Sequence, residues 1–96
     1  MARRPNSSPQ TLAVLSALLN SNGWRHGVSL SQETGLKPGT LYPLLIRLHG
    51  AGYLESEWQA PERPGRPARH AYRLNGAGRA LAEERLAARG IVAKPA

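Results

Sequence analysis

The sequence contains no cysteine, and this absence excludes several classes of site at once. Without cysteine the chain can form no disulfide bond, no thiolate metal site and no cysteine nucleophile, so its fold must depend on packing alone. Aspartate is also absent, which leaves six acidic residues, all glutamate, against thirteen lysines and arginines. Long apolar runs are missing as well, because none approaches the roughly 18 residues that a membrane span needs.

An export signal is another absent feature. Arg3 and Arg4 provide N-terminal positive charge, but the apolar stretch over residues 12–19 is interrupted by Ser16 and has helical periodicity. This is not the apolar core of a signal peptide, so we expect a cytoplasmic protein with no membrane partner. Its 96 residues are enough for one domain with a modest core, and too few for an additional catalytic or ligand-binding domain.

The feature present in excess is positive charge. Arginine supplies eleven of the thirteen basic residues, and the net charge is +7 on 10.4 kDa. Such a charge indicates a polyanionic partner, and arginine is the side chain best suited to phosphates and base edges. Composition alone leaves open that the charge only keeps a small protein soluble, or that it reflects an arginine-rich proteome. The positions of the charges must decide between these interpretations.

Turn and capping residues predict one folded domain over residues 9–90. Residues 1–8 are polar and contain a proline, so we expect a flexible basic arm there, and we expect a flexible tail over residues 91–96. Helical periodicity and helix-start signals predict four helices, over residues 9–20, 29–35, 38–49 and 76–89. The second of these helices starts at Ser29 in the S-x-x-Q pattern of a capping box.

Between the last two helices the pattern changes to that of a β-hairpin. Residues 53–59 alternate as a strand does, and residues 70–74 resume a second short strand. The intervening residues 60–69 contain three prolines and a glycine, which a central strand or a helix would not accept, so they form a loop. Residues 24–28, before the second helix, are expected to be only a short connection.

The order of the predicted elements is helix, short helix, turn, helix, hairpin and helix. This is the order of a winged helix-turn-helix, so the predicted fold class is mostly α with a small β-hairpin (α+β). In this fold the third helix enters the DNA major groove by its N-terminal end. The hairpin, called the wing, lies along the neighbouring backbone or minor groove.

A specific string begins at the turn before the third helix, where residues 35–45 read Gly-Leu-Lys-Pro-Gly-Thr-Leu-Tyr-Pro-Leu-Leu. Further characteristic positions are Arg-Leu at 47–48, Gly-Tyr-Leu at 52–54, Tyr-Arg-Leu-Asn at 72–75, and Gly78. Over about residues 11–81, the sequence resembles the PadR-like family of transcriptional repressors. The resemblance implies that Thr40, Tyr42 and nearby basic side chains contact DNA, and that the last helix helps to build a homodimer.

The candidate DNA-binding residues of the third helix are Lys37, Gly39, Thr40, Tyr42, Pro43 and Arg47. Lys37 stands where the family usually has a small hydroxyl residue, and a cation at a helix start opposes the helix dipole. A bound phosphate would resolve this conflict, and an exposed lysine without a role is the alternative. The hydroxyls of Thr40 and Tyr42 are expected to reach DNA, unless they are ordinary surface with Tyr42 packed on the hairpin. Arg47 suits the DNA backbone, and Pro43 is expected to bend the helix.

The candidate wing residues are Arg63, Gly65, Arg66, Arg69 and His70. The Gly65-Arg66-Pro67 string resembles the core of an AT-hook, in which an extended arginine lies along a narrow A·T-rich minor groove. A proline-rich solvated turn is the alternative. Arginines so close together would repel each other unless an anion compensates them, which favours the DNA interpretation.

The candidate dimerisation residues are Leu12, Ala77, Leu81, Ala82 and Leu86. They provide apolar surface that a core of this size is not expected to absorb completely. We expect a homodimer on a pseudo-palindromic operator, because two half-sites multiply the few base contacts of one domain into useful specificity.

No catalytic or metal site can be assembled from His26, His49 and His70, because they lack metal-ligand spacing and a carboxylate or nucleophile at a fixed offset. We therefore expect no enzyme, no metal and no cofactor, and a small-molecule effector stays open but is not indicated. The predicted function is a sequence-specific regulator that binds double-stranded DNA and represses transcription. An architectural or recombination accessory protein is the alternative. RNA binding is less favoured, because the sequence does not reveal a stacking pair of aromatic residues on a sheet.

Overall fold

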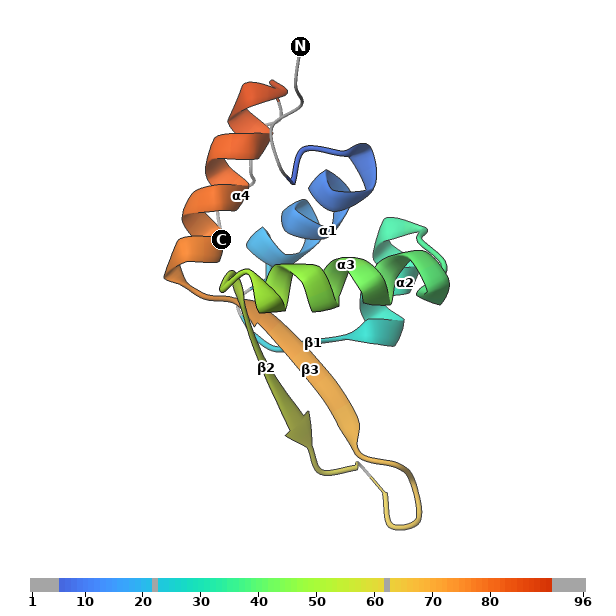
Figure 1. The fold of residues 1–96 in the computed structure, drawn as a ribbon. Helices are drawn as coiled ribbons and strands as arrows, with labels where there is room; N and C mark the ends of the chain where they lie inside the picture. Colours follow the sequence, from blue (N-terminus) through green and yellow to red (C-terminus); the bar gives the residue numbers. More distant parts are fainter. Residues whose placement is uncertain (1–5, 22, 62, 91–96) are drawn as a thin grey trace.

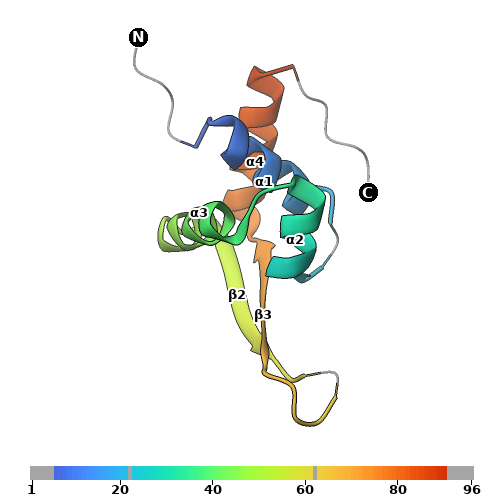
Figure 2. The ribbon, with the colours of Figure 1, turned by 90° about the vertical axis from the view of Figure 1, so that its right-hand side faces the viewer.

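A computed structural model describes residues 6–21, 23–61 and 63–90 of the chain. The elements in this part of the chain are α1 (Pro9–Leu19), β1 (Arg25–His26), α2 (Gly27–Thr34), α3 (Pro38–Gly50), β2 (Leu54–Gln59), β3 (Arg69–Leu74) and α4 (Gly76–Ala88). The helices form one body, from which the β2–β3 hairpin projects as a wing (Figures 1 and 2). This arrangement confirms the predicted winged helix-turn-helix fold class.

The start of α1 follows its capping signal. The Ser8 hydroxyl accepts a hydrogen bond from the backbone N–H of Thr11 at 3.2 Å, and Pro9 occupies the first helical position. Proline is tolerated there because the first amides of a helix have no partner within the helix. The predicted start of the first helix is therefore confirmed.

The start of α2 differs from the prediction. The helix begins at Gly27, two residues before the predicted capping box, and the His26 side chain makes no capping hydrogen bond. Ser29 lies inside the helix, where its hydroxyl accepts a hydrogen bond from the Arg25 guanidinium at 2.8 Å. The capping-box prediction is wrong because an arginine side chain uses the serine oxygen. The predicted end is confirmed, since Gly35 closes the helix with a left-handed φ of 74°.

The core is built mainly from leucines. The predicted stripe of α3 is buried at all four positions, Leu41, Leu44, Leu45 and Leu48. It packs with buried leucines of the other three helices and of the hairpin base, and α1 contacts both α4 and α2. This core holds α3 so that its opposite side remains exposed.

The sheet has three antiparallel strands in the order β1-β3-β2. The predicted hairpin is present, with Trp58 opposite His70 and Leu54 opposite Leu74. Strand β1 was not predicted, because a strand of two residues has no alternation to detect. It pairs Arg25 with Tyr72 and thereby ties the start of α2 to the base of the wing.

The wing base is fixed to α4 by a cap and a close approach. The Asn75 side chain accepts a hydrogen bond from the Gly78 N–H at 2.8 Å and donates one to the Gly52 carbonyl at 2.8 Å. A Cβ at Gly78 would lie 2.1 Å from the carbonyl oxygen of Tyr53, so only glycine fits this position. The predicted Asn75 cap is confirmed, and its second hydrogen bond links the start of α4 to Gly52, shortly before β2.

Candidate nucleic-acid interface

The first turn of α3 is exposed and contains no acidic residue. Lys37 is the N-cap, and its side chain makes no capping hydrogen bond, as its chemistry requires. Its carbonyl accepts hydrogen bonds from the backbone N–H groups of Thr40 and Leu41, each at 2.9 Å. A Cβ at Gly39 would meet no neighbouring atom, so the surface around this residue is open. Lys37, Gly39 and Thr40 thus form a continuous exposed helix start with positive charge at its tip.

Tyr42 is held against the start of α2. A Cβ at Gly27 would lie 2.1 Å from the Tyr42 hydroxyl oxygen, so the tyrosine ring covers the Gly27 backbone. The Tyr42 side chain is nevertheless 37% exposed. Packing on the hairpin alone does not describe the position of Tyr42, because its close contact is with Gly27 of α2.

Pro43 is exposed and α3 continues through it to Gly50 without interruption. Proline removes one backbone donor within the helix, but the leucine stripe on the opposite side remains buried along the whole of α3. The residue therefore adds a rigid apolar ring to the exposed side of the helix.

Arg47 joins α3 to α1. Its guanidinium donates a hydrogen bond to the Thr11 hydroxyl at 3.0 Å. The same Thr11 oxygen accepts a hydrogen bond from the Ser8 hydroxyl at 2.9 Å, and Thr11 is fully buried in the folded chain. This contact gives Arg47 a positioning role in the helical body.

The tip of the wing gathers positive charge. Gly65 has a left-handed φ of 85°, and the Arg66 N–H donates to the Arg63 carbonyl at 3.3 Å, so the chain turns sharply here. A hollow of about 570 Å³ is lined by Pro61, Arg63, Arg66, Pro67 and Arg69. None of these lining residues is acidic. The hollow thus brings three arginines together with two prolines, while Glu62 of the same loop lies outside the described residues.

His70 belongs to an aromatic stack on the sheet and not to the cationic tip. The rings of Trp58 and His70 are stacked at 4.5 Å with an interplanar angle of 10°, and Tyr72 lies 4.6 Å beyond His70. The Tyr72 hydroxyl and His70 Nδ1 are 3.0 Å apart. Burial, and then the nearby Tyr42, raise the pKa of Tyr72 above its ordinary value. The sequence did not reveal this stack, because strand register brings the rings together.

A second hollow, of about 380 Å³, lies where α2, α3 and the wing meet. Its lining includes Val28, Tyr42, Trp58 and Arg69. Val28 and Trp58 are 67% and 69% exposed, respectively. The hollow lies between Tyr42 of α3 and the part of the wing strands that leads to the tip.

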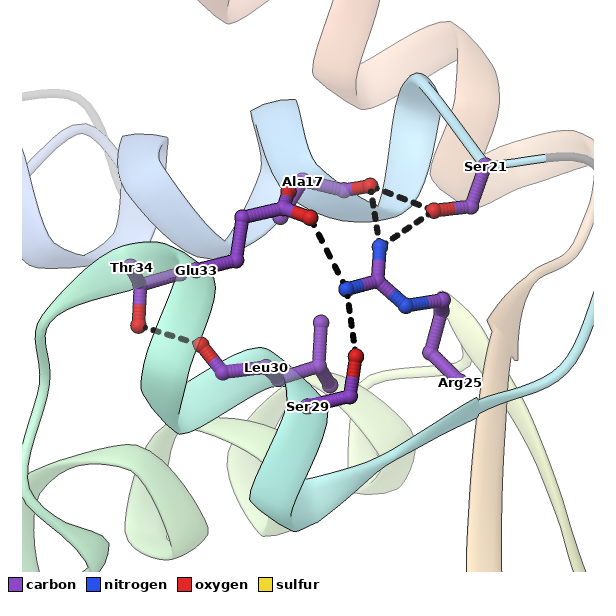
Figure 3. Close-up of polar contacts among 7 residues, drawn as sticks. All are labelled: Ala17, Ser21, Arg25, Ser29, Leu30, Glu33 and Thr34. Carbon is purple, nitrogen blue, oxygen red and sulfur yellow. Dashed lines mark hydrogen bonds and ion pairs between the residues drawn. The ribbon is translucent and has the colours of Figure 1, made fainter.

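Arg25 is occupied within the protein. Its guanidinium donates to the Ala17 carbonyl and the Ser21 hydroxyl of the α1 end, at 3.3 and 2.5 Å (Figure 3). It also forms an ion pair with Glu33 of α2 at 2.9 Å (Figure 3). Sequence reasoning missed this junction, although the spacing of four between Ser29 and Glu33 marks one helix side.

Arg73, at the base of the wing, is also paired. Its guanidinium lies 3.0 Å from the Glu55 carboxylate and 4.3 Å from the centre of the Trp24 ring. Charge is therefore partly neutralised at the wing base.

The predicted dimerisation residues are mostly core residues of a single chain. Leu12, Leu81, Ala82 and Leu86 are 4%, 7%, 0% and 1% exposed, respectively. The expectation that the core leaves them free is wrong, because α1 and α4 pack directly on each other. Ala77 is exposed on α4 and remains available to a second copy.

Among the described residues, neither a metal site nor a membrane-spanning helix is found. They contain no group of three His, Cys, Asp or Glu side chains arranged to hold a metal ion. Over the same residues, every helix is too short or too polar to cross a bilayer. The predicted arm, its Arg3 and Arg4, and the predicted tail over 91–96 lie outside the described residues, apart from positions 6–8.

Among curated proteins, the chain is similar to a transcriptional regulator. The chain is 47% identical over 68 residues to Transcriptional regulator Rv3488 of Mycobacterium tuberculosis (strain ATCC 25618 / H37Rv). This alignment covers 65% of the chain and 61% of the relative, so the chain spans less than two thirds of that protein.

Solved structures and the family comparison agree with this relative. A PadR-like transcription factor from Bacteroides fragilis is 30% identical with a TM-score of 0.66, covering 82% of this chain and 80% of that one. The structure of smu.1704 from Streptococcus mutans UA159 has a TM-score of 0.69 at 27% identity, covering 92% and 84%. Residues 14–84 match the Transcriptional regulator PadR-like family, close to the range of the predicted resemblance. The chain therefore belongs to the PadR-like family of transcriptional regulators.

Proposed function

We propose that this protein is a sequence-specific regulator that binds double-stranded DNA, with α3 in the major groove and the wing along the adjacent minor groove. The observation that carries the proposal is the pairing of two surfaces in one winged fold. One is the exposed start of α3, which is free of acidic residues, and the other is the wing tip lined by Arg63, Arg66 and Arg69. Both surfaces suit a polyanion, and in a winged helix-turn-helix these two elements meet neighbouring grooves.

The start of α3 supplies the contacts that fix the register on DNA. Lys37 neutralises a phosphate beside the helix N-terminus, where amides without helical partners add further attraction. Gly39 permits close approach of the backbone, and the Thr40 hydroxyl donates to a phosphate or a base edge. Tyr42 contributes its exposed edge, Pro43 a shape contact, and Arg47 positions α3 through Thr11.

The wing supplies most of the electrostatic affinity. Arg66, presented by the turn at Gly65, lies along a narrow minor groove with Arg63 and Arg69 on the flanking phosphates. His70 supports the wing from within the Trp58 stack. Arginine is favoured in narrow A·T-rich minor grooves because their negative potential is enhanced, so an A·T preference beside each half-site follows.

We further propose that the regulator is a repressor that binds a pseudo-palindromic operator in the cytoplasm as a homodimer. Two copies are needed because one domain makes few base contacts. Since the leucines of α4 are buried, the second copy must meet the exposed alanine side of α4 that contains Ala77. A small alanine surface allows close helix approach but buries little area, so the dimer is expected to be strengthened by DNA.

Selection of bound sequences from a random duplex pool, followed by footprinting, tests the proposal. A regulator enriches a symmetric site and protects both half-sites, whereas an architectural protein bends DNA without needing a symmetric sequence. Thr40→Ala should reduce the affinity for the enriched site about tenfold without lowering the melting temperature, because only one exposed hydroxyl is removed. Unchanged affinity, or a loss of folding, would contradict the assignment of α3.

RNA binding is a second candidate, favoured by one observation. Trp58 is 69% exposed at the end of the stack on the sheet, and such a ring can accept an unpaired base. Competition between the enriched duplex and single-stranded RNA of equal length separates the two functions. The DNA proposal requires that the protein bind the duplex more tightly than the RNA at every salt concentration.

A further inference from the structure

We infer that Ile46 is a specificity-determining residue that recognises the C5-methyl group of a thymine in the major groove. The inference rests on the proposed DNA-binding function and names the base contact made by the middle of α3.

The side of α3 that faces away from the core is apolar along its centre. Gly39, Pro43, Ile46 and Gly50 follow one another at spacings of three and four, opposite the buried leucines, and all four are exposed. We call these four residues the α3 crest. Ile46 is 69% exposed and is the largest side chain of the crest. Neither Ile46 nor Pro43 can donate or accept a side-chain hydrogen bond.

The polar side chains that flank the crest are turned to neighbouring elements. The Tyr42 hydroxyl covers Gly27, and the Arg47 guanidinium is bound to Thr11. His49 Nε2 lies 3.3 Å from the Ser56 hydroxyl of β2. The middle of α3 therefore offers a groove mainly an aliphatic surface, although its start offers Lys37 and Thr40.

An aliphatic surface in the major groove selects thymine by exclusion as well as by contact. Every base presents hydrogen-bonding groups there, thymine through O4, and an isoleucine removes their water without replacing the lost hydrogen bonds, so only a base with an added apolar group offsets this loss. Thymine presents a methyl group, which isoleucine contacts favourably. A T·A pair is thus the base pair that costs least opposite Ile46.

Charge identifies DNA, and not another protein, as the occupant of the crest. No residue of α3 is acidic, Lys37 stands at its start, and the wing hollow is lined by three arginines. A protein-docking surface would need a larger apolar patch, whereas glycines occupy two of the four crest positions. Ile46 is the one large aliphatic side chain of the crest, and it suits a single thymine methyl group that lies between phosphate contacts.

Deoxyuridine substitution tests the inference, because it removes only the methyl group of thymine and keeps base pairing. The wild-type protein first selects its site from a random duplex pool, and each thymine of one half-site is then replaced in turn. We expect one thymine at which the replacement weakens wild-type binding about fourfold, the effect of one buried methyl group. For Ile46→Ala the thymine and deoxyuridine sites should bind equally.

Val28→Ala is the matched control, because Val28 is equally exposed at 67% but lies on α2 outside the crest. This variant should keep the fourfold preference for thymine, and all three proteins should keep the same melting temperature. Tight wild-type binding with no thymine preference, or an unchanged preference in Ile46→Ala, overturns the inference and leaves the proposed function intact. Absence of any enriched duplex overturns both, so the two failures are distinguishable.

Discussion

The two surfaces proposed to meet DNA are built in opposite ways. The α3 crest is a regular helix side of glycine, proline and isoleucine, whose polar neighbours contact Gly27, Thr11 and Ser56. The wing tip is an irregular turn in which proline, glycine and arginine alternate around a hollow of about 570 Å³. One surface is nearly neutral and rigid, and the other is cationic.

This difference separates affinity from specificity. Arginines that neutralise phosphates release counterions and strengthen binding to any duplex, but they carry little sequence information. A neutral helix side adds little to nonspecific attraction, and its shape and methyl contacts distinguish bases. A single small domain can thus hold DNA with the wing and distinguish sequences with α3. Changes in the wing should leave the sequence preference measurable, and changes in α3 should leave the salt-dependent affinity measurable.

The largest effect is expected from removing the wing charge. The double variant Arg63→Ala with Arg66→Ala should weaken binding roughly 10- to 100-fold at low salt and reduce the salt slope of log affinity by about two. The order of preference among major-groove sequences should stay the same. Affinity measured across a salt series for both proteins provides the test.

Arg89→Ala is the control for net charge, because Arg89 is exposed at the far end of α4. It should leave the salt slope nearly unchanged. If the control and the wing variant lose affinity equally, the charge acts without regard to position and the comparison between surfaces fails.

A smaller effect is expected at the contact that positions Tyr42. Gly27→Ala places a Cβ where the Tyr42 hydroxyl now lies, so the ring must swing away from α2. DNA affinity should fall about tenfold because the edge of α3 is displaced, while the salt slope stays constant because no charge is lost. Gly76→Ala is a matched control, since a Cβ there meets no neighbour. Wild-type affinity in Gly27→Ala would mean that the position of Tyr42 is irrelevant to binding.

The free energy of unfolding of Arg47 variants sharpens the comparison between α3 and the wing. Arg47→Ala removes a hydrogen bond to the buried Thr11, so the free energy of unfolding should fall by about 1 kcal/mol. Denaturant unfolding of Arg47→Ala, Thr11→Val and the double variant should reveal coupling between the two positions. A salt slope that falls by about one, with no loss of stability, would instead make Arg47 a phosphate contact like those of the wing.

The features that could be predicted from the sequence are those that depend on neighbouring residues in the chain. The α3 stripe, the Ser8 cap and the Asn75 cap follow local periodicity and local hydrogen bonds, and each is present in the structure. The strings over residues 35–45, 47–48, 52–54 and 72–75 together also indicated the family.

The features that were missed depend on contacts between distant residues. Strand β1 exists because Arg25 pairs with Tyr72, and the Trp58–His70 stack exists because strand register aligns the two rings. The leucines of α4 were assigned to a dimer because their periodicity does not tell which partner covers them, and α1 covers them. Amphipathic spacing identifies a buried helix side but not the surface that buries it.

The smallest expected effect concerns Tyr72, which stands where α3 and the wing meet. Its pKa lies above the ordinary value of 10.0, chiefly because of burial and then because of Tyr42, so the folded protein keeps this proton longer than the unfolded chain does. As pH rises from the ordinary value through the raised one, the unfolded chain loses the proton first, and stability must therefore fall. Melting temperatures between about pH 9 and about pH 11 should decline, and Tyr72→Phe should decline less steeply, whereas Tyr53→Phe should behave as the wild type because Tyr72 still titrates. Equal slopes for wild type and Tyr72→Phe would show that this junction does not link ionisation to folding, and the two surfaces would then have to be positioned by the Asn75 cap and the strand pairing alone.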